Sequence, residues 1–137
     1  MRVLIVTSAD ETIGGVPYLV GNLARELQKH GHQVIFFHSG TTLRLKKKTT
    51  QWGFTGFSLN LQVPFGERHP IISLLLFSLR FPVALFQLIR FIHKHRIEVI
   101  NVHYPAECLF YFALCRKLLP ITLVTSVHGA DLFPGGR

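Results

Sequence analysis

Residues 2–38 read RVLIVTSADETIGGVPYLVGNLARELQKHGHQVIFFH. The first six of these residues form an apolar run that ends in small polar residues, as in a strand buried on both faces of a parallel sheet. Apolar residues then recur at helical spacing over 16–30, with Pro17 suited to the first turn and Gly31 to the C-terminal cap. A second apolar run occupies 33–38. Strand, helix and strand in this order predict a right-handed parallel crossover.

The rest of the chain continues the alternation of strands and helices. We expect a polar connection over 40–50, a third strand over 54–63, one or two core helices over 71–95 that bend or break near Pro82, a fourth strand over 98–103, a helix over 106–118 and a fifth strand over 121–127. This order predicts an α/β fold: a Rossmann-like, doubly wound, mainly parallel sheet in a three-layer α/β/α arrangement.

Composition indicates one domain with a real core and anionic partners. The 137 residues are 48% hydrophobic and 16% charged, far from the composition of disordered chains. The formal net charge of +8 favours phosphates or an acidic membrane surface as partners, although a basic solvated face without a partner is an open alternative. Clustered lysines without interleaved aromatic residues argue against nucleic-acid binding.

The cysteines and the N-terminus bear on the compartment. Cys108 and Cys115 lie seven residues apart in one predicted helix, too far apart for a disulfide, and are expected to be buried thiols. The chain enters its first strand directly after Arg2, without the apolar core of a signal peptide. We therefore expect a cytoplasmic protein. The apolar segment 71–92 resembles a membrane span in composition, but its two arginines argue against spanning.

Candidate site residues lie where the predicted strands end, because open α/β sheets bind ligands beyond the carboxyl ends of their strands. Gly14 and Gly15 precede the first helix, whose free amides can receive a diphosphate, although a tight turn explains two glycines equally well. His103 and His128 follow the fourth and fifth strands, and Asp131 shares the loop of His128. Either imidazole can contribute hydrogen bonds near pH 7 or be satisfied inside the core.

Several other kinds of site are disfavoured. The first turn lacks the Gly-x-Gly-x-x-Gly pattern and the second strand is not followed by an acidic residue, which argues against a nicotinamide site. No Gly-Lys-Ser/Thr sequence occurs, so a P-loop is absent. The spacing of histidines and cysteines predicts no metal site. The basic segment 44–48 can contact lipid phosphates or be an ordinary surface loop, and Trp52 beside it can insert at a membrane interface or pack.

Three motifs resemble those of the retaining family-four GT-B glycosyltransferases. The paired glycines at 14–15 lead into a helix with Leu-Ala-x-x-Leu and then Gly-His-x-Val at 31–34. Residues 98–103 (EVINVH) form the second match, and residues 125–131 (TSVHGAD) are similar to the family's T-x-H-G-x-D loop. The motifs occur in the family's order and extend over the whole chain.

The resemblance implies that residues 1–137 are the N-terminal, acceptor-side domain of a two-domain enzyme whose C-terminal nucleotide-sugar domain is absent from this sequence. It implies that Gly14 and Gly15 approach the donor's diphosphate and that His128 contacts the transferred sugar. Asp131 would shape its loop or meet the acceptor, and His103 would line the floor of the cleft. Such enzymes transfer a sugar from a nucleotide-sugar donor to an acceptor hydroxyl with retention, and generally need neither metal nor cofactor.

Basic charge together with the Phe- and Leu-rich segment favours a lipid-linked or saccharide acceptor of the cell envelope, with peripheral contact at the inner face of an anionic membrane. Two alternatives stay open. One is a non-catalytic Rossmann-like fragment or binding module that needs a partner domain, because this chain alone is expected to be inactive. The other is half of a GT-B nucleotide-sugar epimerase, which shares the same architecture.

Overall fold

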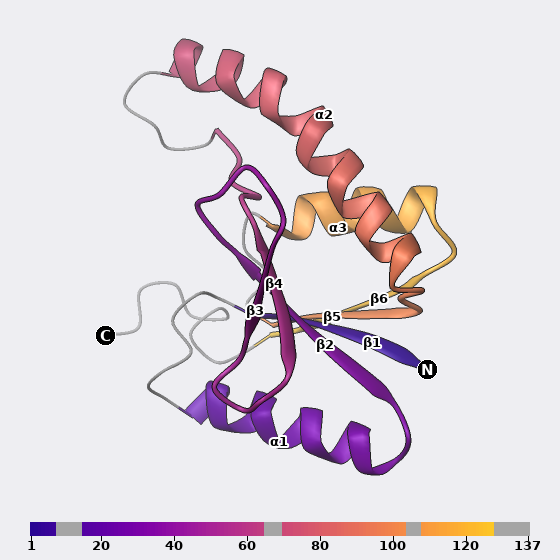
Figure 1. Ribbon diagram of the computed structural model, residues 1–137. Helices are drawn as coiled ribbons and strands as arrows, with labels where there is room; N and C mark the ends of the chain where they lie inside the picture. The colour runs from indigo at the N-terminus through magenta and orange to yellow at the C-terminus, as the bar shows by residue number, and fades with distance from the viewer. Residues whose placement is uncertain (8–14, 65–69, 104–107, 128–137) are drawn as a thin grey trace.

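The computed structural model describes residues 1–7, 15–64, 70–103 and 108–127. Its elements are β1 (Arg2–Thr7), α1 (Gly15–Lys29), β2 (Gln33–Ser39), β3 (Lys46–Thr49), β4 (Thr55–Leu59), α2 (Pro70–Lys94), β5 (Val99–His103), α3 (Cys108–Leu118) and β6 (Thr122–Ser126). The strands form one six-stranded sheet in the order β3-β4-β2-β1-β5-β6. Figure 1 shows α1 on one face of this sheet and α2 and α3 on the other. The predicted three-layer α/β/α architecture is confirmed.

The sheet is mainly parallel because each crossover returns the chain to the end of the sheet at which the previous parallel strand began. β1 pairs in parallel with both β2 and β5, while β2 pairs in parallel with β4 and β5 with β6. The chain therefore moves outward from β1 in one direction and then in the other, which is the doubly wound arrangement. As a result, β1, β2, β4, β5 and β6 all end at the same edge of the sheet (Figure 1).

The predicted connection over 40–50 is wrong in one part, because it contains β3. This short strand carries three consecutive lysines and pairs antiparallel with β4, with Lys47 opposite Phe57. All of its residues are exposed, so no apolar alternation marks it in the sequence. It forms because the turn before β4 lets the chain fold back onto that strand, with Gly53 at φ 82°. Exposed lysines are a usual feature of an edge strand, since they discourage pairing with other chains.

Helix α1 ends as its sequence predicts. Gly31 adopts φ 79°, the left-handed conformation that favours glycine. The amide of His32 donates to the carbonyl oxygen of Leu27 at 3.0 Å, and that of Gly31 to Gln28 at 3.0 Å. These two bonds satisfy the last carbonyls of the helix and direct the chain into β2.

The break that we expected near Pro82 is absent, because helix α2 runs through this residue. The expected core helix is present, but the N-terminal half of α2 packs against the core with one side only, through Phe77, Phe81 and Ala84. Pro82 removes the donor for the carbonyl of Ser78, but both residues are exposed, so water can hydrate that carbonyl. Leu88, Phe91 and Ile92 are buried against the sheet, whereas most apolar residues before Phe86 are exposed.

Each face of the sheet has its own apolar core. On the α2 and α3 side, the buried residues include Leu4, Phe37 and Phe112, and Cys108 and Cys115 are buried with them as predicted. Burial raises the pKa of Cys115 to about 12. On the α1 side, the core consists of Val3, Ile5, Val20, Ala24, Val34 and Phe36.

Trp52 packs within the protein. Its indole lies 5.2 Å from the ring of Phe36, measured between centroids, and it belongs to the core on the α1 side. It also lies directly over Gly21 of α1, where a Cβ atom would come within 2.6 Å of the indole nitrogen. Of the two sequence alternatives for Trp52, packing is therefore the one observed.

Candidate functional site

The candidate site lies at the edge where the parallel strands end and helix α1 begins. β1 ends at Thr7, β2 at Ser39, β5 at His103 and β6 at Ser126, and α1 starts at Gly15. In open α/β sheets, this edge is the usual place for ligands. The first turn of α1 adds backbone amides without helical partners and the positive end of the helix dipole.

On the α1 face of the sheet, the side chains change from apolar to polar at the carboxyl ends of the strands. Ile5 and Phe36 are fully buried in the core, but two residues further along the same strands are Thr7 and His38. These two lie opposite each other in the parallel register, with 3.0 Å between Thr7 Oγ1 and His38 Nδ1, and both are buried. Ser58 of β4 is the next residue in this row, in register with His38.

The row continues on the other side of β1. His103 of β5 is in register with Ser126 of β6. The hydroxyl of Ser126 donates to the Asn101 side-chain oxygen at 2.9 Å. Because alternate residues of a strand share one face, Asn101 and His103 lie on the same face as Val99, which packs into the core on the α1 side. Polar side chains from five strands thus meet at one edge and on one face.

The predicted site residues differ in how far the structure describes them. Gly15 is the first residue of α1, as expected of a residue at the helix N-terminus. His103 is the last residue of β5 and is 3% exposed. Gly14, His128 and Asp131 lie outside the described residues. β6 ends at Ser126, two residues before His128, on the side of the sheet where α1 begins at Gly15.

Sequence reasoning did not single out His38, Thr7 or the pair formed by Asn101 and Ser126. Each is a polar residue at or near the end of an otherwise apolar strand, and that position was the available signal. His38 is not part of the motifs that resemble the family, so only the parallel register reveals that it lies opposite Thr7.

A pocket of about 390 Å³ lies at the end of β4, on the opposite face of the sheet. Its walls come from the segment after β4, from the first half of α2 and from α3, with Leu43 completing the rim. Its polar lining includes Asn60, Gln62, Ser73 and Arg80. The remaining lining residues are Val63, Pro64, Leu76, Phe77, Leu79, Val83, Ala84 and Tyr111.

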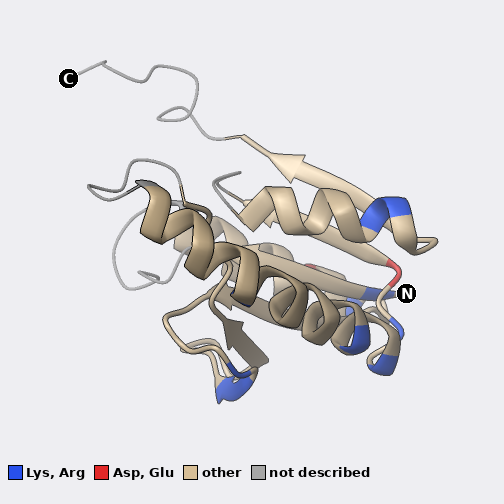
Figure 2. Ribbon diagram, turned by 90° about the horizontal axis from the view of Figure 1, so that it is seen from above, with Lys and Arg blue, Asp and Glu red and all other residues tan. Residues whose placement is uncertain are grey.

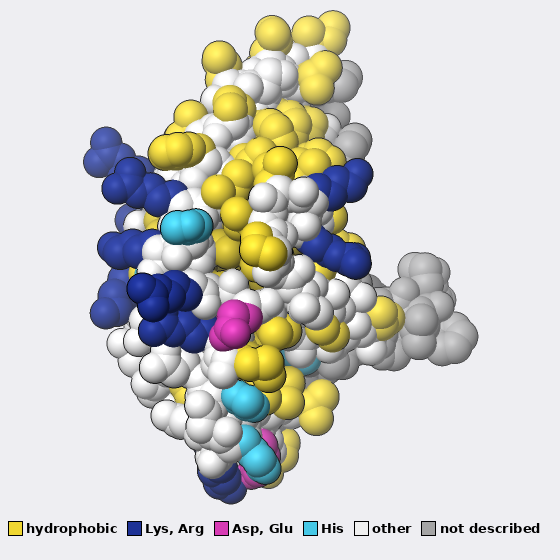
Figure 3. Space-filling model, turned by 90° about the vertical axis from the view of Figure 1, so that its right-hand side faces the viewer, with side chains coloured by type: hydrophobic (Ala, Val, Ile, Leu, Met, Phe, Trp, Pro, Cys, Tyr) yellow, Lys and Arg dark blue, Asp and Glu magenta, His cyan; other side chains and the backbone are white. Residues whose placement is uncertain are grey.

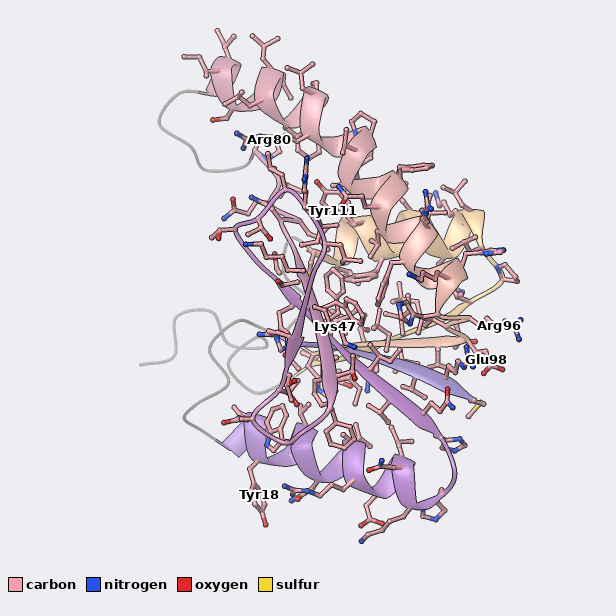
Figure 4. All side chains as sticks on the ribbon, in the orientation of Figure 1. Tyr18, Lys47, Arg80, Arg96, Glu98 and Tyr111 are labelled. Carbon is pink, nitrogen blue, oxygen red and sulfur yellow. The ribbon has the colours of Figure 1, made fainter. Side chains whose placement is uncertain are left out.

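Tyr111 and Arg80 give this pocket its chemical character (Figure 4). Burial raises the pKa of Tyr111, so its hydroxyl stays protonated, and it donates to the carbonyl oxygen of Gln62 at 3.4 Å. Arg80 is exposed and supplies a cation at the rim. The pocket is therefore suited to a molecule with an apolar part and an anionic or hydroxyl-rich part.

Within the described parts of the chain, no group of three or more His, Cys, Asp or Glu side chains is arranged to hold a metal ion. The polar row is instead made of hydroxyls, imidazoles and an amide, which are hydrogen-bonding groups. Such groups can orient a sugar or a phosphate ester through hydrogen bonds.

Comparison with known proteins agrees with this architecture. The family model described as Glycosyltransferase Family 4 matches residues 13–137. The N-acetyl-alpha-D-glucosaminyl L-malate synthase of Bacillus anthracis is 25% identical over 134 residues, which cover 96% of this chain and 32% of that protein.

A solved structure, the sucrose-phosphate synthase of Thermosynechococcus elongatus, superposes with a TM-score of 0.59 at 14% identity. The match covers 96% of this chain and 34% of that one. The chain thus spans about a third of the length of both proteins. The match of the family model to nearly the whole chain, together with the doubly wound sheet, shows that the chain belongs to glycosyltransferase family 4 and fits the N-terminal domain of a GT-B glycosyltransferase.

Proposed function

We propose that this chain is the acceptor-side domain of an enzyme that transfers a sugar from a nucleotide-sugar donor to an acceptor hydroxyl with retention of configuration. The observation that carries the proposal is the polar row beneath the start of α1, at the edge where strands β1, β2, β5 and β6 end. Membership of glycosyltransferase family 4 supports transfer over the epimerase alternative.

The donor's diphosphate would lie against the first turn of α1. Backbone amides at Gly14 and Gly15 can donate to phosphate oxygens, and the absence of side chains lets the phosphate come close. Negative charge grows on the departing diphosphate as the sugar bond breaks. Fixed amide dipoles at that position stabilise this charge without reorganising in the reaction.

The histidines would act on the sugar side of the cleft. His128 follows β6 by two residues and would contact the transferred sugar near its reacting carbon, with Asp131 shaping the same loop. His103 is buried at the end of β5, so its role in the cleft floor would be to support the ligand from below. The hydrogen bond between Thr7 and His38 would stiffen the adjacent strand ends.

The acceptor would be a lipid-linked or saccharide component of the cell envelope, reached from the cytoplasmic side. The pocket between β4 and α2 supports an acceptor with an apolar part, because most of its lining is apolar while Arg80 supplies a cation. The donor nucleotide-sugar is a substrate, and no cofactor enters this proposal.

The experiment compares His128→Ala with a matched control, His93→Ala, in the complete enzyme. His93 is exposed in the last turn of α2, at the opposite edge of the sheet, so its loss should not alter turnover. We expect His128→Ala to lower turnover at least about tenfold, as losses of positioned polar groups do. Wild-type rates in His128→Ala, with both variants folded by circular dichroism, would remove His128 from the site.

A second measurement tests the diphosphate role separately. Gly15→Val places a branched side chain where the phosphate would approach, and should weaken donor binding in calorimetry. The relative's name makes N-acetylglucosamine the first sugar to test, as a nucleoside diphosphate derivative. Unchanged affinity of Gly15→Val for a donor that the wild type binds would contradict this role.

A further inference from the structure

The first four turns of α2 expose an apolar surface of unusual extent. Ile71 is 75% exposed, Leu79 74% and Phe86 63%. The other exposed apolar residues of this segment are Ile72, Leu74, Leu75, Leu76 and Val83. Figure 3 shows these hydrophobic side chains gathered at the top of the molecule, and Figure 1 shows that this half of α2 extends beyond the sheet. A large exposed apolar patch generally marks an interaction site.

The arrangement of this patch distinguishes it from the face of an ordinary core helix. In the C-terminal half of α2, one face packs on the sheet through Leu88, Phe91 and Ile92. The outward side of the first half carries Ile72, Leu75, Leu79, Val83 and Phe86 at spacings of three or four residues, opposite the core-facing side. Phe77, Phe81 and Ala84 on the other side of the same segment pack against the core, so the outward stripe is the part that lacks an apolar surrounding.

The charges near this helix define the chemistry of its partner. Helix α2 contains no acidic residue, and Arg80, Arg90 and Lys94 lie on it, all exposed. Among the described residues, the acidic ones are Glu26 and Glu98, and each already has a cationic partner. Figure 2 shows this excess of Lys and Arg over Asp and Glu along the chain. The net charge of +8 therefore favours a negatively charged surface.

The same helix cannot cross a bilayer while the domain stays folded. Residues Ile71–Lys94 are long and apolar enough for a span, with a mean hydropathy of 1.9. However, Leu88 and Phe91 are part of the core on the α2 side, so the last two turns are held against the sheet. Only the outward side of the first four turns is available to lipid, and it can lie in the interface with the arginines of the helix reaching the phosphates.

We propose that residues 71–86 of α2 dock this domain on an anionic lipid bilayer, with the apolar side chains in the interface and Arg80 and Arg90 at the lipid phosphates. The proposal adds a docking element to the proposed function, and it is measured without any sugar transfer. Leu79 and Arg80 also line the pocket proposed for the acceptor, so vesicle binding in the absence of sugar transfer is the measurement that tests this proposal, whereas His128→Ala and Gly15→Val test the proposed function.

The test is co-sedimentation of the protein with two kinds of vesicle, one of phosphatidylcholine and one of equal parts phosphatidylcholine and phosphatidylglycerol. We expect binding to the mixed vesicles that weakens as salt rises, because salt screens the contact with lipid phosphates. Leu79→Glu should lower the affinity for the mixed vesicles at least about tenfold, since it replaces an apolar contact with the bilayer by a negative charge, which the anionic lipid repels. Arg80→Gln should lower it about fivefold.

Leu118→Glu is the matched control, because Leu118 is also an exposed leucine, at 61%, but lies at the end of α3. It should bind as the wild type does. Equal binding by Leu79→Glu and the wild type would overturn the proposal. Equal binding of the wild type to the two kinds of vesicle would overturn it as well. A wild-type dimer in sedimentation velocity that Leu79→Glu converts to a monomer, without vesicle binding by either, would show that a second copy covers this face and would likewise overturn it.

Discussion

Replacing Leu88 and, separately, Leu79 by alanine removes the same atoms from two positions of one helix with opposite environments. Leu88 is fully buried in the core on the α2 side, whereas Leu79 is 74% exposed. Deleting a buried leucine costs the transfer free energy of the lost atoms and the free energy of the cavity that remains. We therefore expect Leu88→Ala to lower the free energy of unfolding by about 3 kcal/mol.

Leu79 has only a small buried fraction to lose, so Leu79→Ala should cost no more than about 0.5 kcal/mol. For a chain of 137 residues, these values correspond to a fall in Tm of about 10 °C for Leu88→Ala and about 2 °C or less for Leu79→Ala. Both variants change helix propensity equally, so the difference between them measures burial alone.

Urea unfolding followed by circular dichroism, and by Trp52 fluorescence, measures both variants against the wild type. Coincidence of the two probes would show that the transition is cooperative. A Leu79→Ala variant as unstable as Leu88→Ala would refute the assignment of the outward side of the first half of α2, which carries Leu79, as an unpacked surface. A harmless Leu88→Ala would refute the packing of the second half against the sheet.

Two further predictions concern titratable side chains. Burial raises the pKa of Cys115 to about 12, against an ordinary value of 9.0, so its thiol should resist iodoacetamide at pH 8 in the native protein and react in urea. Mass spectrometry of the peptide that contains Cys115 measures the extent of labelling. Rapid labelling of the native protein would contradict its burial. The pKa of His95 is lowered by burial first and then by Lys94, Arg2 and Lys47, so its NMR titration should have a midpoint below 6.5, and Lys47→Gln should raise that midpoint. Because the folded protein resists protonation of His95, the contribution of this residue to stability is present above pH 6.5 and is lost as the pH falls below that value. An unchanged titration midpoint in Lys47→Gln would show that Lys47 does not lower the pKa of His95.

Local patterns predicted most of the elements. The strand over 2–7, the helix that ends before Gly31 and the strand over 33–38 are all present, because period and capping are short-range properties. β3 was not predicted, since Lys46, Lys47 and Lys48 have no apolar face and their pairing depends on β4. The strand predicted over 54–63 exists, but it ends at Leu59, where pairing with β2 ends.

The candidate site was predictable only in outline. The rule that ligands bind where parallel strands end pointed to His103 and to the glycines before α1. It did not identify the contact of Thr7 with His38, because that contact depends on which residues of β1 and β2 come into register. The roles predicted for Gly14, His128 and Asp131 stay predictions, since these residues lie outside the described part of the chain.

The amino-acid sequence alone determined the alternation of strands and helices, the sheet class and the family, because apolar period, glycine caps and short motifs are written along neighbouring residues. Only the tertiary structure decided that the first half of α2 extends past the sheet and stays exposed while the second half is buried. The exposed first half is at least as apolar in sequence as the buried second half. Burial depends on whether another part of the chain lies opposite, and that is a long-range property which no local pattern records.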